Sequence, residues 1–464
     1  MNLSTMLARC EAQHEPIMVG LVGAGKFGSM FLAQARLTLG MQILGIVDLD
    51  VERAKENCRA TGWSDEQLSA PDLDAAAATG ATYVSDDAAA LIAHPELDVL
   101  IEATGDAKVG IRHCQAAIEA RKHVIMVNVE ADVLAGPLLA RRAETAGVVY
   151  SLAWGDQPAL IAEHVDWARA CGFKVVCAGK GTRYHPDFHR STPDTVWDNF
   201  HFGRETAERG GMNPKMFNSF IDGTKSAIEM TAVCNATSLT PQPDGLKFTP
   251  CSRDDLAEVL KPESAGGTVS HSGTTEVVSS LNRDMTPVDN DLMLGTYVVI
   301  EGENDYVRHC FEEYRMLPDS TFHYAALYRP THMIGLELGI SVASVVLRGE
   351  ATGFPDGFRS DVVATAKRPL KQGEILDGEG GYMVWGKQMP ARAAMAMGGL
   401  PLGLATGVAL TRDIEEGEQL TWADAEIDED DEAVKVRREM EGMFRRVNVE
   451  TAEPERGAKW VMNN

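Results

Sequence analysis

A glycine pattern near the start of the chain constrains the fold more than any other feature. The pattern G-x-G-x-x-G occupies 23–28, directly after an apolar run at 17–22, and a helix and a second strand are expected over 27–47. In such a unit the glycines permit a tight turn, close approach of the backbone to a pyrophosphate, and packing of helix against strand. Asp48 follows the second strand, where an acid commonly hydrogen-bonds the adenosine ribose. The stretch therefore predicts a dinucleotide-binding unit.

Strands and helices alternate from 17 to 156, which predicts an α/β fold beginning with a doubly wound parallel sheet, the Rossmann arrangement. Such sheets bind ligands at the carboxyl ends of their strands, where Thr104, Gly105 and Asn128 are expected. A loop position for Gly105 and a strand end for Asn128 are the structural alternatives. The residues that we expect to bind the cofactor are Gly23, Gly25, Lys26, Phe27, Gly28, Asp48, Arg53, Thr104, Gly105, Asn128 and Glu130.

The charges after the second strand bear on the form of the cofactor. Asp48 favours NAD(H), because its carboxylate suits a free ribose hydroxyl and repels a 2′-phosphate. A cation just beyond that strand can neutralise the phosphate, so Arg53 or Lys55 could admit NADP(H). A solvated helix face is the alternative interpretation of both cations.

Composition narrows the range of partners and of compartments. The 464 residues carry a formal net charge of −25, which argues against nucleic acid or an anionic membrane as partner. No apolar run reaches transmembrane length and no signal-peptide pattern opens the chain, so we expect a cytoplasmic protein. The eight cysteines show no C-x-x-C spacing and are expected to be reduced thiols. The apolar β segments and the tail predict a homodimer.

The pattern divides the chain into five parts. These are an N-terminal arm at 1–16, the Rossmann domain at 17–156, an α+β catalytic and dimerisation domain at 157–350, a small β-rich domain at 351–430, and a charged tail at 431–464. An antiparallel sheet is expected over 240–330, and a long helix after Pro330. The β-rich part holds an internal repeat, 364–382 and 409–427, with a turn expected at a Gly-Glu pair in each copy.

A glycine-flanked loop in the middle third could bind an anion. Lys180 and Arg183 lie beside glycines, which let backbone donors join the cations. Arg283 and Arg329, at the edges of the expected sheet, could complete the pocket, although exposure is the default for an arginine. His185 and His189 have helical spacing, but the proline between them disfavours a metal site on a continuous helix.

A polar stripe over 215–235 is the strongest candidate for catalysis. Asn218, Asp222, Lys225 and Glu229 recur at helical spacing among apolar residues. An exposed face with ion pairs of about 0.2–0.5 kcal/mol each is the structural alternative. Few polar positions lie outside the stripe, so we expect a largely buried helix, and a buried stripe of Asp, Lys and Glu indicates a site.

Several long motifs carry a resemblance to known proteins. They are GKGTRYHPDFHRSTPDTVW, GMNPKMFNSFIDGTKSAIEM, SSLNRD, HMIGLELGISVASVVLRGEATG and DGEGGY. With them the chain resembles bacterial oxidoreductases whose N-terminal part is related to homoserine dehydrogenase and whose C-terminal repeat is similar to the SAF domain. The family includes reductoisomerase-like enzymes that convert 1-deoxy-D-xylulose 5-phosphate to 2-C-methyl-D-erythritol 4-phosphate, a step of isoprenoid precursor synthesis, with NADPH and a divalent cation.

The resemblance implies roles for the basic and acidic residues of the middle third. Lys225 would move a proton or stabilise an alkoxide, as the similar lysine of homoserine dehydrogenases does. Asp222 and Glu229 would orient Lys225 or hold Mg²⁺ or Mn²⁺. Homoserine itself is not the expected substrate, because those enzymes read Asn-Lys where this chain reads Asn128-Val129-Glu130. The cations expected to bind the substrate, with Lys180 also catalytic, are Lys180, Arg183, Lys215, Arg283 and Arg329.

Three functions are compatible with these features. The leading one is an NADPH-dependent reductoisomerase of a phosphorylated deoxyketose. The second is an NAD(P)-dependent dehydrogenase of a polyol or hydroxy acid, or of its phosphate, in carbohydrate catabolism. The third is a protein that binds a nucleotide or a carbohydrate without catalysis.

Overall fold

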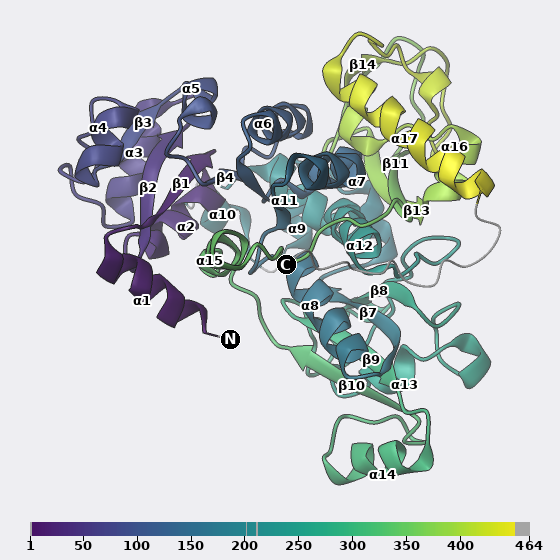
Figure 1. The fold of residues 1–464 in the computed structure, drawn as a ribbon. Helices are drawn as coiled ribbons and strands as arrows, with labels where there is room; N and C mark the ends of the chain where they lie inside the picture. The colour runs from purple at the N-terminus through teal and green to yellow at the C-terminus, as the bar shows by residue number, and fades with distance from the viewer. Residues whose placement is uncertain (1, 201, 210–211, 451–464) are drawn as a thin grey trace.

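The computed structural model describes residues 2–200, 202–209 and 212–450, and its N-terminal part is built on a parallel sheet (Figure 1). The strand order is β3-β2-β1-β4-β5-β6, and every neighbouring pair is parallel. This confirms the predicted α/β fold class and its doubly wound sheet. The strands are β1 (Ile17–Val22), β2 (Met41–Val47), β3 (Tyr83–Ser85), β4 (Val99–Glu102), β5 (His123–Met126) and β6 (Tyr150–Leu152).

Helices connect these strands, and most begin at a side chain that caps them. The N-terminal part contains α2 (Lys26–Ala35), α3 (Val51–Ala60), α4 (Leu73–Thr79), α5 (Ala88–Ala93), α6 (Ala107–Glu119) and α7 (Val129–Ala146). Asn128 caps α7 by accepting a hydrogen bond from the Ala131 N–H at 3.1 Å, so α7 begins at Val129, and Glu130 lies in its first turn.

Two helices distant in sequence complete this part. The helix α1 (Leu3–Gln13) packs on α15 (Gly339–Arg348), which contacts β1, β5 and α2. The long helix expected after Pro330 is wrong in length. Gly335 has φ +76°, and a Cβ there would lie 2.8 Å from the Cβ of Met30, so the chain turns closely over α2 before α15 begins.

The central segment, residues 157–338, surrounds a second sheet of order β10-β9-β7-β8. The expected antiparallel sheet is mixed, because β7 pairs in parallel with β8 and antiparallel with β9. Its strands are β7 (Lys174–Thr182), β8 (Thr274–Ser279), β9 (Thr296–Glu301) and β10 (Tyr324–Arg329). Its helices are α8 (Gln157–Ala170), η1 (Pro186–Arg190), α9 (Val196–Asn199), α10 (Arg204–Arg209), α11 (Pro214–Ile221), α12 (Thr224–Thr237), α13 (Leu256–Val259), η2 (Glu263–Ala265) and α14 (Asp305–Glu313).

The polar stripe expected on one helix is divided between two. Helix α11 ends at Ile221, Gly223 adopts φ +88°, and α12 begins at Thr224. A Cβ at position 223 would lie 3.2 Å from a ring carbon of His189, so a glycine suits both the backbone angle and the close packing. The break turns the first half of the stripe away from the second.

The C-terminal β segment, residues 360–427, packs beside α12 and α7 (Figure 1). Its elements, and the helix that follows it, are β11 (Ser360–Ala366), β12 (Ile375–Asp377), β13 (Val384–Pro390), α16 (Ala391–Met397), η3 (Leu402–Leu404), β14 (Thr406–Ala409), η4 (Trp422–Asp424) and α17 (Glu432–Glu450). Both expected turns of the repeat are present, with φ +83° at Gly373 and +79° at Gly417, and Leu370 pairs across the repeat with Ile414.

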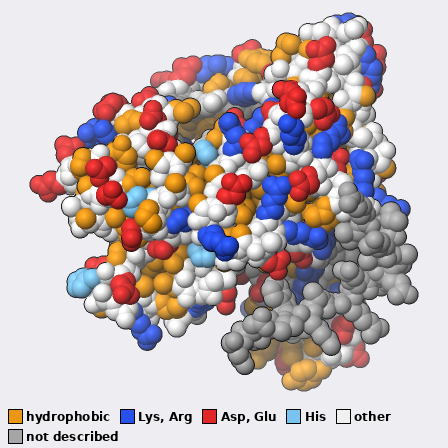
Figure 2. All heavy atoms as spheres, turned by 45° about the horizontal axis from the view of Figure 1, so that its top comes forward, with side chains coloured by type: hydrophobic (Ala, Val, Ile, Leu, Met, Phe, Trp, Pro, Cys, Tyr) orange, Lys and Arg blue, Asp and Glu red, His pale blue; other side chains and the backbone are white. Residues whose placement is uncertain are grey.

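Acidic and basic side chains are interspersed over the face shown in Figure 2. None of the helices in the described ranges is long and apolar enough to cross a membrane. The C-terminal helix α17 returns to α7, where the fully buried Arg437 pairs with Asp361 and Glu441. The predicted homodimer stays a prediction.

Candidate active site

The glycine loop after β1 leaves space on one side only. Gly23 has φ +98°, and a Cβ there would lie 2.5 Å from the Ala103 carbonyl oxygen; a Cβ at Gly28 would lie 2.4 Å from the Gly23 oxygen. At Gly25, by contrast, a Cβ would meet nothing within 4 Å. Gly25 caps α2 without a side chain, and the first-turn N–H groups of a helix have no partner inside it. An open loop with free donors fits the pyrophosphate of a dinucleotide.

Asp48 holds this loop in place by a hydrogen bond and pairs with Arg53 at the rim of the loop. One carboxylate oxygen accepts the Ala24 N–H at 2.9 Å, and the other pairs with the Arg53 guanidinium at 3.0 Å. Asp48 is nearly buried, whereas 57% of the Arg53 side chain is exposed. Lys55 pairs instead with Glu52 at 3.1 Å. Arg53 is therefore the cation that lies beside the acid expected at the ribose.

The residues expected near the nicotinamide meet at the carboxyl edge of the sheet. The Thr104 hydroxyl donates to the buried Glu102 carboxylate at 2.6 Å, and the Asn128 amide donates to the Asp106 carbonyl at 2.8 Å. Gly105 has φ +74° with open space around its missing side chain. The edge thus offers fixed polar groups beside an open position.

Lys225 brings the central segment to this edge. It lies in the first turn of α12, and its ammonium pairs with the Glu130 carboxylate, with side chains 18% and 15% exposed. Burial alone would lower the pKa of Lys225, but the charges of Glu130, Glu379, Glu229 and Asp156 raise it above its usual value. Lys225 is therefore an ammonium at neutral pH, able to donate a proton or stabilise a negative oxygen.

Lys180 forms a second pair, with Glu229, and this pair is shielded from solvent. Both side chains are at most 5% exposed, and the Lys180 ammonium also donates to the Gln157 side-chain oxygen at 2.9 Å. Beside this pair, Asp156 follows β6 and caps α8. Burial and the charge of Glu229 raise the pKa of Asp156 to about 6.

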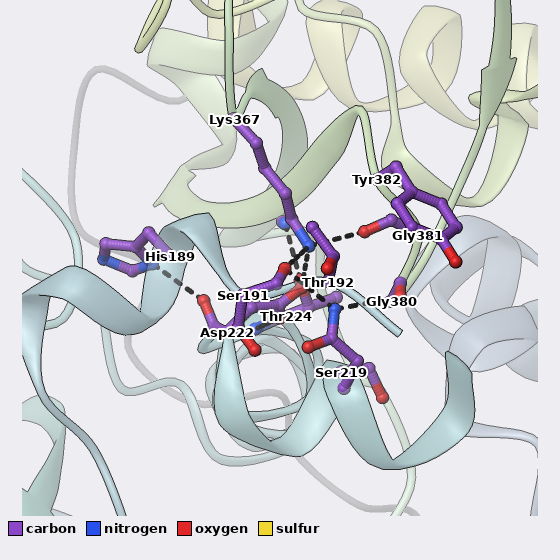
Figure 3. A network of polar contacts seen from close by, with 12 residues as sticks. His189, Ser191, Thr192, Ser219, Asp222, Thr224, Lys367, Gly380, Gly381 and Tyr382 are labelled. Atoms are coloured by element: carbon purple, nitrogen blue, oxygen red, sulfur yellow. Dashed lines mark hydrogen bonds and ion pairs between the residues drawn. The ribbon is translucent and has the colours of Figure 1, made fainter. Parts of the chain in front are cut away.

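Asp222 takes part in a third pair, with Lys367 (Figure 3). Its carboxylate lies 2.7 Å from the ammonium of Lys367, which also donates to the carbonyls of Ser191 at 2.8 Å and Gly381 at 2.7 Å. The other Asp222 oxygen accepts the Thr224 N–H and so caps α12. Asp222 and Glu229 are thus bound to different lysines, and no group of three metal-ligating side chains exists among the described residues.

The other cations expected to bind the substrate are bound to protein acceptors. Arg183 donates to the Asn199 carbonyl at 2.7 Å, Lys215 to the Asp377 carbonyl at 2.5 Å, and Arg283 to the Lys247 carbonyl at 2.9 Å. Arg329 pairs with Glu337. Of the cations expected to bind the substrate, Lys180 alone is paired with an acid of the predicted stripe.

The two histidines of the same loop also have protein partners. His189 contacts the Asp222 carbonyl at 2.7 Å and the Tyr184 hydroxyl at 2.8 Å, and it stacks on Trp385. His185 contacts the Arg283 carbonyl at 3.2 Å. Both rings therefore hold the loop in place.

Sequence reasoning missed three residues of the site. Asp156 comes four residues after Leu152, the end of the last strand of the parallel sheet, so the rule on carboxyl ends of strands could have found it. Glu379 stands alone among glycines in DGEGGY, a pattern that indicates a shaped loop. Lys367 gives no local signal, because its partner Asp222 lies in another part of the chain.

Comparison with known proteins identifies the class. Residues 19–152 match the family model described as the NAD binding domain of homoserine dehydrogenase, and residues 155–338 match oxidoreductase DRL, catalytic domain. Together with the glycine loop and the sheet edge, these matches make the chain an NAD(P)-dependent oxidoreductase. A search of curated proteins gave no match.

Some solved structures are also similar to this chain, with low sequence identity. Biliverdin reductase from Synechocystis sp. PCC 6803, solved with biliverdin and NADP⁺, has 18% identity and a TM-score of 0.26; the match covers 37% of this chain and 48% of the reductase, about half its length. Myo-inositol dehydrogenase from Lactobacillus casei, solved with NAD(H) and myo-inositol, has 12% identity and a TM-score of 0.35; the match covers 62% of this chain and 72% of the dehydrogenase.

These findings correct the expected resemblance. Neither matching family model describes a 1-deoxy-D-xylulose 5-phosphate reductoisomerase, so that identification is wrong, and the expected isoprenoid chemistry and divalent cation lose their basis. The expected similarity to the NAD-binding domain of homoserine dehydrogenase is confirmed for residues 19–152. The third function considered, binding of a nucleotide or a carbohydrate without catalysis, is set aside because both matching family models describe oxidoreductases. The similarity of the C-terminal repeat to the SAF domain stays a prediction.

Proposed function

We propose that the chain is an NAD(P)-dependent dehydrogenase that interconverts a hydroxyl group of a neutral polyol or sugar with the corresponding carbonyl. The observation that carries the proposal is the Lys225–Glu130 pair at the carboxyl edge of the parallel sheet. A nicotinamide bound at this edge supplies or accepts the hydride. Lys225, as an ammonium, donates the proton to the carbonyl oxygen during reduction and takes it back during oxidation.

The charge of the site supports a neutral substrate. The acids Glu130, Glu229 and Asp156 outnumber the cations Lys225 and Lys180, and both cations are already paired. A phosphate or a carboxylate would meet this excess of negative charge. Hydroxyl groups, by contrast, donate hydrogen bonds that carboxylates accept. The polyol alternative is therefore favoured over phosphorylated sugars and hydroxy acids.

NADP(H) is the proposed form of the cofactor, with Arg53 as the residue that admits it. The Arg53 guanidinium is exposed at the rim of the loop and would turn from Asp48 toward a 2′-phosphate. NAD(H) binding would leave the Asp48–Arg53 pair in place.

A substrate panel tests the proposal. The full chain is incubated with NAD⁺ or NADP⁺ and with polyols and aldoses, each beside its phosphate ester, and reduced cofactor is followed by absorbance. We expect turnover of unphosphorylated compounds, with the Lys225→Met variant as the blank. Turnover confined to phosphate esters would refute the neutral substrate. Equal turnover by Lys225→Met would refute the assigned role of this lysine.

A further inference from the structure

The C-terminal β segment reaches the candidate active site through one loop, residues 377–382. Three contacts hold the loop against α11 and its surroundings. Lys215 donates to the Asp377 carbonyl, and Asn218 donates to the Gly380 carbonyl at 3.0 Å. Lys367 donates to the Gly381 carbonyl (Figure 3). The Asp377 carboxylate in turn accepts the Met383 N–H at 3.2 Å. The loop is therefore fixed at both ends and in its middle.

Glycines surround the one long side chain of this loop. A Cβ at Gly378 would lie 1.9 Å from the Thr406 hydroxyl, a Cβ at Gly380 2.0 Å from the Lys215 carbonyl, and a Cβ at Gly381 2.3 Å from the Asp377 carboxyl carbon. Gly378 and Gly380 also have positive φ, at +71° and +66°. Only glycine suits these positions, and their conformation determines where Glu379 lies.

Glu379 lies beside the pair that carries the proposed chemistry. It lines one cavity with Glu130, between α7, α12 and the C-terminal β segment, and it is hydrogen-bonded to Ser219. The charged groups that face it are Glu130 from α7, Lys225 from α12 and Asp222 at the end of α11. The remaining acid of the cavity, Asp361, is paired with Arg437.

We infer that the C-terminal β segment belongs to the active site and contributes Glu379 as the positioning residue that restores the proton of Lys225. The reaction rests on the proposed function. In reduction, the hydride forms the new C–H bond, and the carbonyl oxygen takes a proton from Lys225. The resulting amine takes a proton from the Glu379 carboxyl across the cavity shared with Glu130, and the Glu379 carboxylate regains one from water. Oxidation runs the same transfers in reverse.

The protonation of Glu379 agrees with this role. Burial and the charge of Glu130 raise the pKa of Glu379 to about 8, against the opposite effects of Lys225 and Ser219. Glu379 therefore carries a proton at neutral pH and loses it in mildly alkaline solution. Above that pH its carboxylate adds a further negative charge near Lys225.

The first test follows the pH profile of carbonyl reduction. We expect Glu379→Gln to lower kcat at neutral pH by about tenfold or more with little change in KM, and to remove the inflection near pH 8. Glu379→Asp should restore part of the rate. Ser219→Ala should move the inflection to higher pH, because the ionised carboxylate loses a hydrogen bond. Glu374→Gln, in an exposed turn of the same segment, is the matched control. A Glu379→Gln profile that superimposes on the wild-type profile would overturn the inference.

The second test needs no substrate. The full chain is acetylated with acetic anhydride over a pH series, and mass spectrometry gives the rate at Lys225. We expect severalfold faster acetylation in Glu379→Gln than in Glu374→Gln at alkaline pH, since one carboxylate fewer leaves more neutral amine. Equal rates in the two variants would overturn the inference. If Glu379→Gln does not fold, Ser219→Ala decides, because an unmoved inflection in its acetylation profile would also overturn it.

The two readouts separate this inference from the proposed function. A change in Lys225 acetylation without turnover of any polyol would support the placement of Glu379 and refute the dehydrogenase. Polyol turnover with an unchanged pH profile and unchanged acetylation in Glu379→Gln would support the dehydrogenase and refute the role of Glu379.

Discussion

Two lysine–carboxylate pairs lie close to each other in this enzyme and differ in their access to solvent. Lys180 and Glu229 are almost fully buried, and Gln157 is a further partner of the lysine. Lys225 and Glu130 are partly exposed, lie at the edge of the Rossmann sheet and have additional carboxylates around them. A closed pair can only hold the fold together, whereas an open pair can exchange a proton with a substrate. Access to solvent therefore gives the two pairs different roles.

The largest effect is expected at the open pair. Replacing Lys225 by Met removes the proton donor, and turnover should fall by about 10²–10⁴-fold. Cofactor binding, measured by quenching of protein fluorescence, should persist because Lys225 lies outside the glycine loop. Lys174→Met, which removes an exposed lysine paired with Glu301, is the control and should keep full activity. Normal turnover in Lys225→Met would contradict a catalytic role for the open pair.

The closed pair should respond in stability. Lys180→Met leaves the Glu229 carboxylate buried without its partner, and the free energy of unfolding should fall by about 3–5 kcal/mol. Urea denaturation of Lys180→Met and Lys225→Met, side by side, measures the difference. The double change Lys180→Met with Glu229→Leu should recover much of the loss, since no buried charge remains. A larger loss in Lys225→Met than in Lys180→Met would contradict the assignment of roles.

A smaller effect is expected from Asp156, which lies beside the closed pair. Because its pKa is raised to about 6 in the folded chain, its contribution to stability is present below the unfolded pKa and is lost as pH rises through 6. Asp156→Asn should therefore gain about 2 kcal/mol over the wild type between pH 4 and pH 7. Denaturation midpoints at these two pH values measure the gain. A difference between the proteins that does not vary with pH would show that Asp156 is ionised throughout.

The smallest effect on stability is expected at Arg53, in a pair still more exposed than Lys225–Glu130. Removal of such a surface ion pair changes stability by at most about 1 kcal/mol, so Arg53→Ala should unfold nearly as the wild type does. The KM for NADPH should rise severalfold while the KM for NADH stays constant. Steady-state kinetics of wild type and Arg53→Ala with each cofactor measure both KM values. Equal changes in the two KM values would remove Arg53 from the recognition of the 2′-phosphate.

The sequence predicts those parts of the enzyme whose signals are local. The glycine pattern, Asp48 and the alternation of strands and helices lie within one continuous stretch, and the sheet follows from them. The stripe over 215–235 fails as one helix because a single residue, Gly223, reverses the backbone angle. Periodicity does not detect such a break when the apolar residues continue beyond it.

Pairing across the chain is the part that sequence patterns leave open. Lys225 is a candidate from its helix alone, but its partner Glu130 comes from the Rossmann domain and its neighbour Glu379 from the C-terminal β segment. Likewise, the role of Asp222 becomes clear only once the fold places Lys367 beside it. Each of these lysines has several acids nearby in sequence, and only the fold determines which acid it meets.

The position of α15 has a consequence for how the chain is made. This helix contributes Val342, Ala343 and Val345 to the core that also holds Leu21 and Phe31, yet it is translated after the whole central segment. The Rossmann sheet is therefore fully covered only after the whole central segment has been synthesised. Until α15 is synthesised, the apolar side chains that it covers in this core lack their packing partner, and such exposed surface favours aggregation of a nascent chain.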